Sequence, residues 1–105
     1  VSDEYGAEAA YMLVLDSYDR GEFEQVETKV YAFADAGSGQ TYWLAKSFIV
    51  LGDSFAERGE LSQAKATFES VRDGYKASDD DDDVQDNVRM RLQRLDAMIS
   101  EKNNQ

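Results

Sequence analysis

Apolar residues recur every three or four positions along most of the chain, a spacing that places side chains on one face of an α-helix. Helices are predicted over about 3–19, 22–36, 41–57, 61–76 and 83–100. The chain contains no proline to interrupt them, and no segment of useful length alternates between apolar and polar residues with the period of a β-strand. We therefore expect an all-α protein with a single domain over residues 1–105.

A short internal repeat indicates that the helices are arranged in pairs. Arg20-Gly21-Glu22-Phe23 recurs as Arg58-Gly59-Glu60-Leu61, 38 residues later. Each copy lies between two predicted helices, so each marks the turn of a helix hairpin. The sequence thus predicts two hairpins, over about 3–36 and 41–77, followed by a single amphipathic helix over about 83–101.

The second hairpin has the clearest packing signature. It reads Phe48-x-x-Leu51-Gly52-x-x-Phe55, followed by Ala64-x-x-x-Phe68. A glycine inside a helix costs about 1 kcal/mol relative to alanine, so Gly52 needs a structural reason. We expect it to allow a close approach of the next helix through Ala64. In the first hairpin Val14 and Val26 take the corresponding positions, which predicts a wider helix crossing there.

This signature resembles the tetratricopeptide repeat (TPR), which reads W-x2-L-G-x2-Y, then A-x3-F, then a proline. Phenylalanine replaces both the tryptophan and the tyrosine here, and Lys76 stands in place of the proline. The resemblance implies antiparallel hairpins stacked as a short right-handed solenoid. Residues 3–36 would form a degenerate repeat, 41–77 a well-matched repeat and 83–101 a C-terminal capping helix.

Residues 40–47 also look like the terminal repeats of large bacterial cell-envelope TPR proteins, and the chain opens with Val-Ser-Asp rather than Met. This resemblance implies the C-terminal part of a larger bacterial TPR-containing protein, processed or fragmented. It favours the cell envelope or periplasm over the cytoplasm.

In TPR proteins the first helix of each pair lines a concave groove that binds peptides or partner helices. By this resemblance the groove residues are Met12, Asp16, Asp19, Lys46, Ile49, Asp53 and Ala56. Three of these seven are aspartates, so the resemblance implies a protein-interaction scaffold that binds a basic or amphipathic peptide or helical segment. The alternative is structural: a terminal cap of a longer TPR array, or a module that self-associates as a homodimer to bury its open N-terminal face.

The composition narrows the possible functions further. With 22 acidic and 11 basic residues the chain has a net charge of −11, which disfavours binding to nucleic acid and to anionic membrane surfaces. No apolar run approaches the ~18 residues of a membrane span, so no direct membrane insertion is expected. Because the chain has neither cysteine nor histidine, we expect no metal, no cofactor and no enzymatic activity.

Three further features have two readings each. The run of aspartates from Asp79 to Asp83 lacks the alternation and the central glycine of a calcium loop, so it predicts a solvated linker and a helix cap, with weak cation binding as the alternative. Trp43 is expected to pack against the second helix, or else to form an exposed platform for a ligand. Met12 and Met90 are expected to fill the core, or else to provide adaptable contact surface.

Overall fold

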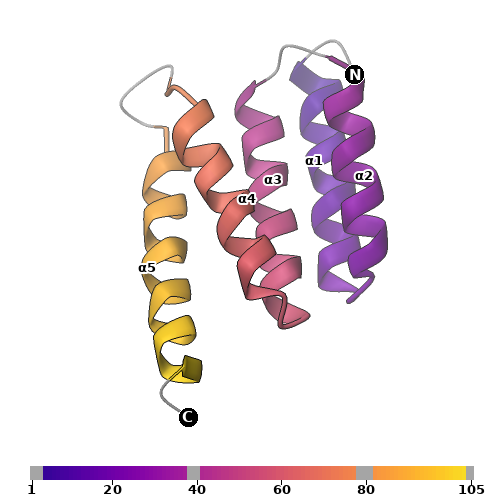
Figure 1. Cartoon of the computed structure of the whole chain (residues 1–105). Helices are drawn as coiled ribbons and strands as arrows, with labels where there is room; N and C mark the ends of the chain where they lie inside the picture. The colour runs from indigo at the N-terminus through magenta and orange to yellow at the C-terminus, as the bar shows by residue number, and fades with distance from the viewer. Residues whose placement is uncertain (1–3, 38–40, 78–81, 104–105) are drawn as a thin grey trace.

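The computed structural model describes residues 4–37, 41–77 and 82–103. Within these ranges the chain forms α1 (Glu4–Asp19), α2 (Phe23–Asp35), α3 (Thr41–Glu57), α4 (Leu61–Gly74) and α5 (Val84–Asn103), as Figure 1 shows. No strand occurs among the described residues, and each helix begins and ends within three residues of its predicted bounds. The prediction of an all-α protein is therefore confirmed.

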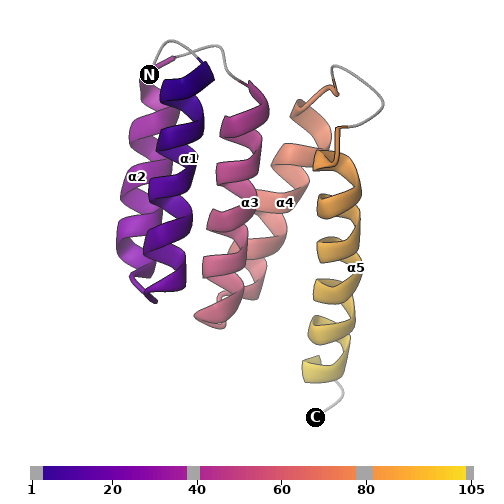
Figure 2. The ribbon, with the colours of Figure 1, turned by 180° about the vertical axis from the view of Figure 1, so that it is seen from behind.

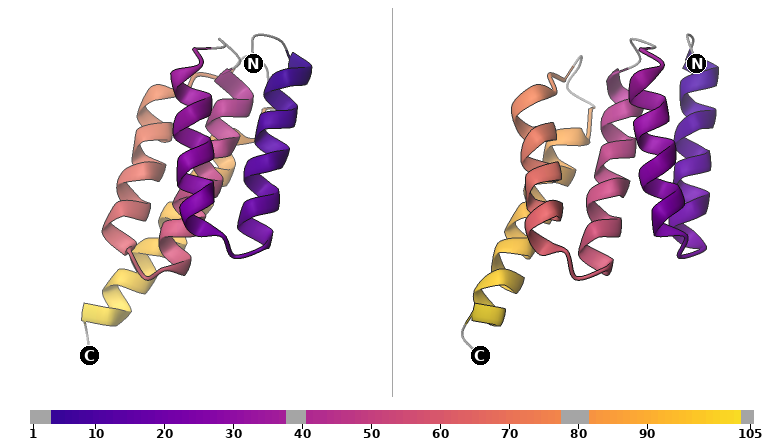
Figure 3. Two further views of the ribbon diagram at one scale, coloured as in Figure 1. Left: turned by 90° about the vertical axis from the view of Figure 1, so that its right-hand side faces the viewer. Right: turned by 45° about the vertical axis from the view of Figure 1, so that its right-hand side comes forward.

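The helices stack in chain order and form a slab with extents of 47 × 32 × 19 Å. Each helix packs against the next one, and α3 also packs against both α1 and α5. Figure 3 places α1 and α3 on one side of the slab and α2 and α4 on the other, while α5 runs obliquely across the end and projects beyond the other helices. This packing is consistent with a helical repeat.

The two hairpin turns are built in the same way. Gly21 and Gly59 adopt left-handed backbone with φ of 74° and 78°, which glycine accepts without steric cost. In each turn the residue after the glycine donates its backbone N–H five residues back, from Glu22 to Ser17 and from Glu60 to Phe55, at 2.9 Å in both cases. These hydrogen bonds give a partner to backbone carbonyl groups at the C-terminal ends of α1 and α3. The turns thus fix a spacing of 38 residues between equivalent positions of α1 and α3.

Gly52 lies in the centre of the core, as its position in the sequence predicts. A Cβ atom on Gly52 would lie 2.4 Å from Cε1 of Phe68, and within 3 Å of two further ring atoms. The absence of a side chain on Gly52 thus makes room for the Phe68 ring of α4. The sequence had predicted a close approach at Ala64 instead. Both Phe68 and Ala64 are buried, and α3 and α4 form the most extensive helix pair of the molecule.

The last helix covers the α3–α4 pair with the apolar stripe that the sequence indicates. Val84, Val88, Leu92 and Leu95 are buried, and Ile99 packs partly against the core. None of the described helices combines the length and the apolar character that a membrane crossing requires.

Three large side chains were given two alternatives each by the sequence. The ring of Trp43 is partly buried and lies 5.5 Å from that of Tyr11 in α1. Met12 and Met90 do not fill the core, because their side chains are 53% and 56% exposed. Both methionines belong to the predicted helices, and the expectation that they fill the core was wrong about the face of the helix on which each lies.

Candidate binding cleft between α1, α3 and α5

A cleft of about 360 Å³ is lined by residues of α1, α3, α4 and α5. Figure 2 shows the side of the molecule on which α1 lies in front of α2 and α3 in front of α4. The lining of the cleft consists of Tyr18, Asp53, Ala56, Glu57, Phe68, Arg91, Arg94, Leu95 and Met98. Phe68 and Leu95 are each only 2% exposed and form an apolar floor, whereas Met98 is 40% exposed. Charged side chains from α3 and α5 form the two walls.

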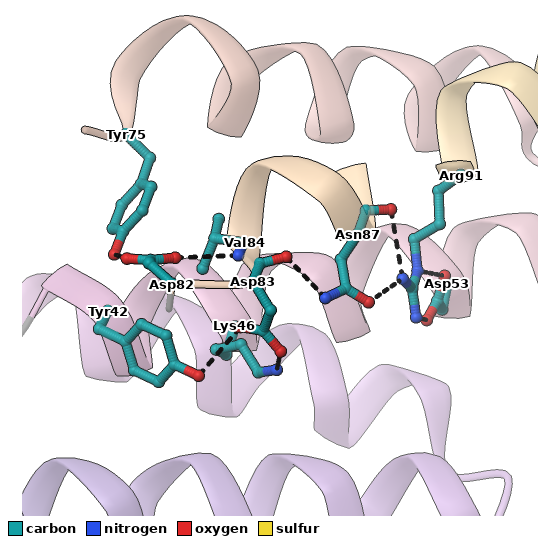
Figure 4. Close-up of polar contacts among 9 residues, drawn as sticks. All are labelled: Tyr42, Lys46, Asp53, Tyr75, Asp82, Asp83, Val84, Asn87 and Arg91. Atoms are coloured by element: carbon teal, nitrogen blue, oxygen red, sulfur yellow. Dashed lines mark hydrogen bonds and ion pairs between the residues drawn. The ribbon is translucent and has the colours of Figure 1, made fainter. Parts of the chain in front are cut away.

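An ion pair joins the two walls, as Figure 4 shows. Arg91 donates from Nε to Oδ1 of Asp53 at 2.9 Å and from Nη2 to Oδ2 at 3.1 Å. The third guanidinium nitrogen donates to the side-chain oxygen of Asn87 at 3.0 Å. A two-pronged pair of this kind is stronger than a single contact and fixes the orientation of both groups. Asp53 therefore lines the cleft with its negative charge balanced by the guanidinium of Arg91.

A second polar group holds the beginning of α5 against α3, outside the cleft (Figure 4). Asp83 accepts hydrogen bonds from Lys46 Nζ and from the Tyr42 hydroxyl, each at 3.0 Å. The hydrogen bond from Lys46 lowers the pKa of the Asp83 carboxyl below its ordinary value of 3.8, partial burial acts in the opposite direction, and the Tyr42 hydroxyl adds to the lowering. Lys46, one of the predicted groove residues, thus joins α3 to the beginning of α5.

The part of the aspartate run that the structure describes has a capping role. Asp82 accepts a hydrogen bond from the backbone N–H of Val84 at 2.9 Å and another from the Tyr75 hydroxyl. The predicted cap of the fifth helix is thus present at Asp82, while Asp83 makes the tertiary contact to α3. Asp79, Asp80 and Asp81, on which cation binding would depend, lie outside the described residues. Among the described residues, no cluster of three or more acidic side chains could hold a metal ion.

The predicted groove residues of α3 fall in three different places. Asp53 and Ala56 line the cleft, and Lys46 contacts Asp83 as described. Ile49 is 4% exposed and belongs to the core. The structure thus brings two of the four predicted α3 positions to the cleft.

The predicted groove residues of α1 do not line the cleft. Met12 and Asp16 are exposed, Asp16 pairs with Arg20 along the same helix, and Asp19 is exposed near the turn. The 38-residue spacing of the two turns explains this difference. It aligns α1 with α3 one residue away from the alignment on which the predicted α1 positions were based. The positions equivalent to Lys46, Ile49, Asp53 and Ala56 are then Glu8, Tyr11, Leu15 and Tyr18. Of these four, Tyr18 lines the cleft.

The charges that remain available in the cleft are those of Glu57 and Arg94. Neither forms an ion pair with any residue that the structure describes. Burial raises the pKa of the Tyr18 hydroxyl above its ordinary value of 10.0, and the carboxylates of Asp53 and Glu57 raise it further. The α3 wall therefore presents a free anion and the α5 wall a free cation.

Sequence reasoning did not include the α5 side of this cleft. Arg91 and Arg94 lie off the apolar stripe of the last helix, and the pattern of the sequence alone assigns them no partner. Their proximity to Leu92 and Leu95, which are buried, is the signal that would have placed them beside the floor of the cleft. Comparisons of the chain with protein-family models, curated proteins and solved structures found no match.

Proposed function

We propose that the chain is a TPR-like interaction module, a short right-handed solenoid that binds a segment of another protein in the cleft between α1, α3 and α5. The repeated turn geometry and the packing of α3 against both α1 and α5 support a solenoid arrangement. In such an arrangement the first helix of each pair, together with the helix that follows the last pair, lines one common surface. The cleft lies on that surface.

The observation that carries the proposal is the combination of an apolar floor with two unpaired charges of opposite sign. Phe68 and Leu95 offer a contact for an apolar side chain, and Met98 can adapt to its shape. Glu57 on α3 attracts a cation and Arg94 on α5 attracts an anion. Such charges contribute mainly to specificity and to the rate of association.

The expected ligand is therefore amphipathic rather than simply basic. The groove predicted from the sequence is acidic because it counts Asp16, Asp19 and Asp53. Asp53 is neutralised by Arg91, and Asp16 and Asp19 lie outside the cleft. We propose a peptide or helical segment with one apolar anchor, a basic residue directed toward Glu57 and an acidic residue directed toward Arg94.

Selection from a random peptide-display library tests this function. Peptides enriched on the wild-type chain should contain an apolar residue flanked by both a basic and an acidic residue. Glu57→Lys should remove the preference for the basic residue, and Arg94→Glu the preference for the acidic one. Glu24→Lys on α2 and Arg89→Glu on the outer side of α5 introduce the same charge changes at exposed positions away from the cleft, so they should leave both preferences intact.

Two results would contradict the proposal. Peptides whose binding is unchanged in both cleft variants would place the binding surface elsewhere. A library that yields no peptide specific for the wild-type chain would favour a purely structural role, in which α5 closes a helical array.

A further inference from the structure

The ion pair between Asp53 and Arg91 belongs to a longer row of polar contacts between α3 and α5. Asp83, Asn87 and Arg91 follow one another at intervals of four residues, so they lie on one side of the helix. Asn87 donates from Nδ2 to the backbone oxygen of Asp83 at 2.7 Å and accepts from Nη1 of Arg91 at 3.0 Å. Figure 4 shows this row, with Lys46 at one end and Asp53 at the other. The row ends at the cleft, which Asp53 and Arg91 both line.

These contacts leave the Arg91 guanidinium little capacity to bind a ligand. Nε and Nη2 donate to the carboxylate of Asp53, and Nη1 donates to the side-chain and backbone oxygens of Asn87, at 3.0 and 3.3 Å. These four hydrogen bonds occupy nearly all of the N–H groups that a guanidinium offers. Asn87 does not line the cleft, so it holds Arg91 along α5 rather than out toward a bound segment.

The hydroxyl of Tyr18 shows that the two charges of the pair act at the same place. Tyr18 lines the cleft from α1, and burial raises the pKa of its hydroxyl above 10.0. The carboxylates of Asp53 and Glu57 raise this pKa further, whereas the Arg91 guanidinium lowers it. Asp19 adds a smaller increase. Asp53 and Arg91 therefore act in opposite directions on one group inside the cleft.

We propose that the Asp53–Arg91 pair determines the charge specificity of the cleft, and that Asn87 positions Arg91 within this pair. When paired, the two side chains remove one anion and one cation from the surface that a ligand meets. Glu57 and Arg94 remain, with one charge of each sign. The pair thus makes the cleft select a segment of balanced charge. This inference rests on the proposed function and deepens it, because it concerns the same cleft.

Peptide-display selection on variants of the pair tests the inference. Asp53→Asn leaves Arg91 without its counter-charge, so the selected peptides should be acidic. Arg91→Gln leaves Asp53 uncompensated, so the selected peptides should be basic. For two peptides that differ by one charge, the ratio of dissociation constants should shift in opposite directions in these variants, by about fivefold. Combining both substitutions removes both charges and should return the preference to peptides of balanced charge.

Two substitutions of Asn87 test its positioning role. Asn87→Ala removes the acceptor of Nη1, so Arg91 can turn toward an acidic ligand. Peptides with one additional acidic residue should therefore bind Asn87→Ala more tightly than the wild type, by a smaller factor than in Asp53→Asn. Asn87→Asp retains an oxygen acceptor for Arg91 and should restore most of the wild-type preference. An Asn87→Ala variant with the wild-type preference would overturn the positioning role.

A second ion pair of α5 provides the matched control. Lys65 Nζ lies 3.2 Å from Oδ1 of Asp96, and neither residue lines the cleft. Lys65→Gln and Asp96→Asn each break this attachment of α5 without changing a charge of the cleft. Both variants should therefore leave the charge preference of the selected peptides unchanged.

The titration of Tyr18 measures the charge of the cleft without a ligand. Nuclear magnetic resonance of isotope-labelled tyrosine follows the ionisation, and Tyr18→Phe identifies its signal among those of the six tyrosines. Asp53→Asn should lower the pKa of Tyr18, because it removes a nearby anion. Arg91→Gln should raise this pKa, because it removes a nearby cation. A loss of packing alone would shift the pKa in the same direction in both variants.

The possible results separate this inference from the proposed function. Peptides of the same charge preference on Asp53→Asn and Arg91→Gln, or a Tyr18 pKa that shifts in the same direction in both, would overturn the inference and leave the proposed function in place. A wild-type chain that binds no peptide would contradict both. Circular dichroism establishes that each variant is folded, and the Asn87 variants, which keep both charges, decide the matter where a single variant of the pair does not fold.

Discussion

Replacing Gly52 by alanine tests the packing of the second hairpin most directly. The added Cβ would lie 2.4, 2.7 and 2.9 Å from Cε1, Cζ and Cδ1 of Phe68, although non-bonded carbons prefer about 3.5–4.0 Å. The ring is 2% exposed, so it cannot move aside without displacing its neighbours. A collision with three atoms of a buried ring falls at the upper end of the usual overpacking cost, at about 2–3 kcal/mol, whereas alanine in place of glycine gains about 1 kcal/mol in helix propensity.

We therefore expect Gly52→Ala to lower the free energy of unfolding by about 1–2 kcal/mol. For a domain of this size each kcal/mol corresponds to a fall in Tm of about 4–8 °C. Urea denaturation followed by circular dichroism measures the change. Gly74→Ala is the matched control, since Gly74 also lies in a helix but a Cβ there would meet nothing within 4 Å. This control should be neutral or stabilising by up to about 1 kcal/mol.

A double-mutant cycle with Phe68→Leu separates this contact from other effects of the substitution. The smaller side chain creates a cavity in the wild-type background, but in the Gly52→Ala background it also relieves the collision. The two substitutions should therefore be coupled by about 1 kcal/mol or more. A Gly52→Ala variant that unfolds at the same urea concentration as the wild type, or at a higher one, would refute the close packing of α3 against the Phe68 ring.

Three other substitutions test separate contacts. Ala64→Leu adds bulk at a fully buried position and should cost about 1–3 kcal/mol in urea denaturation; an unchanged midpoint would contradict tight packing there. Arg91→Ala leaves the partly buried Asp53 carboxylate without its guanidinium partner and should cost about 1–3 kcal/mol, less in an Asp53→Ala background. Because the folded state holds the pKa of Asp83 below 3.8, this carboxylate stabilises the fold above about pH 4 and loses that effect as the pH falls through its folded pKa. Asp83→Asn should flatten the acid dependence of the unfolding free energy, and a curve parallel to that of the wild type would contradict this.

The helices and their order could be predicted from the sequence because local signals determine them. Apolar spacing marks each helix, and the glycines of the repeated turns adopt the left-handed backbone that ends α1 and α3. Gly52 could be recognised as a packing site because a helical glycine has a cost that burial must offset. Its partner could not, since Ala64 and Phe68 lie on the same side of α4 and only the three-dimensional crossing decides which one reaches the glycine.

The cleft could be predicted only in part, for a different reason. One residue of misalignment rotates a helical position by about 100°, enough to exchange Tyr18 for Asp19 in α1. The α5 wall depends on how an oblique helix lies across α3, which periodicity does not specify. The pairing of Asp53 with Arg91 joins residues 38 positions apart along the chain, and it changes the charge of the cleft that the sequence predicts.

The packing of α3 between its neighbours on both sides also affects how the chain folds. Every helix contact joins elements one or two apart along the chain, and none joins α1 to α4 or α5, or α2 to α4 or α5, within the described residues. Few long loops must close before native contacts form, so the entropy barrier to folding is low and folding should be fast for a chain of this length. A nucleus at the α3–α4 hairpin can then grow toward either end, with α1–α2 adding on one side and α5 on the other.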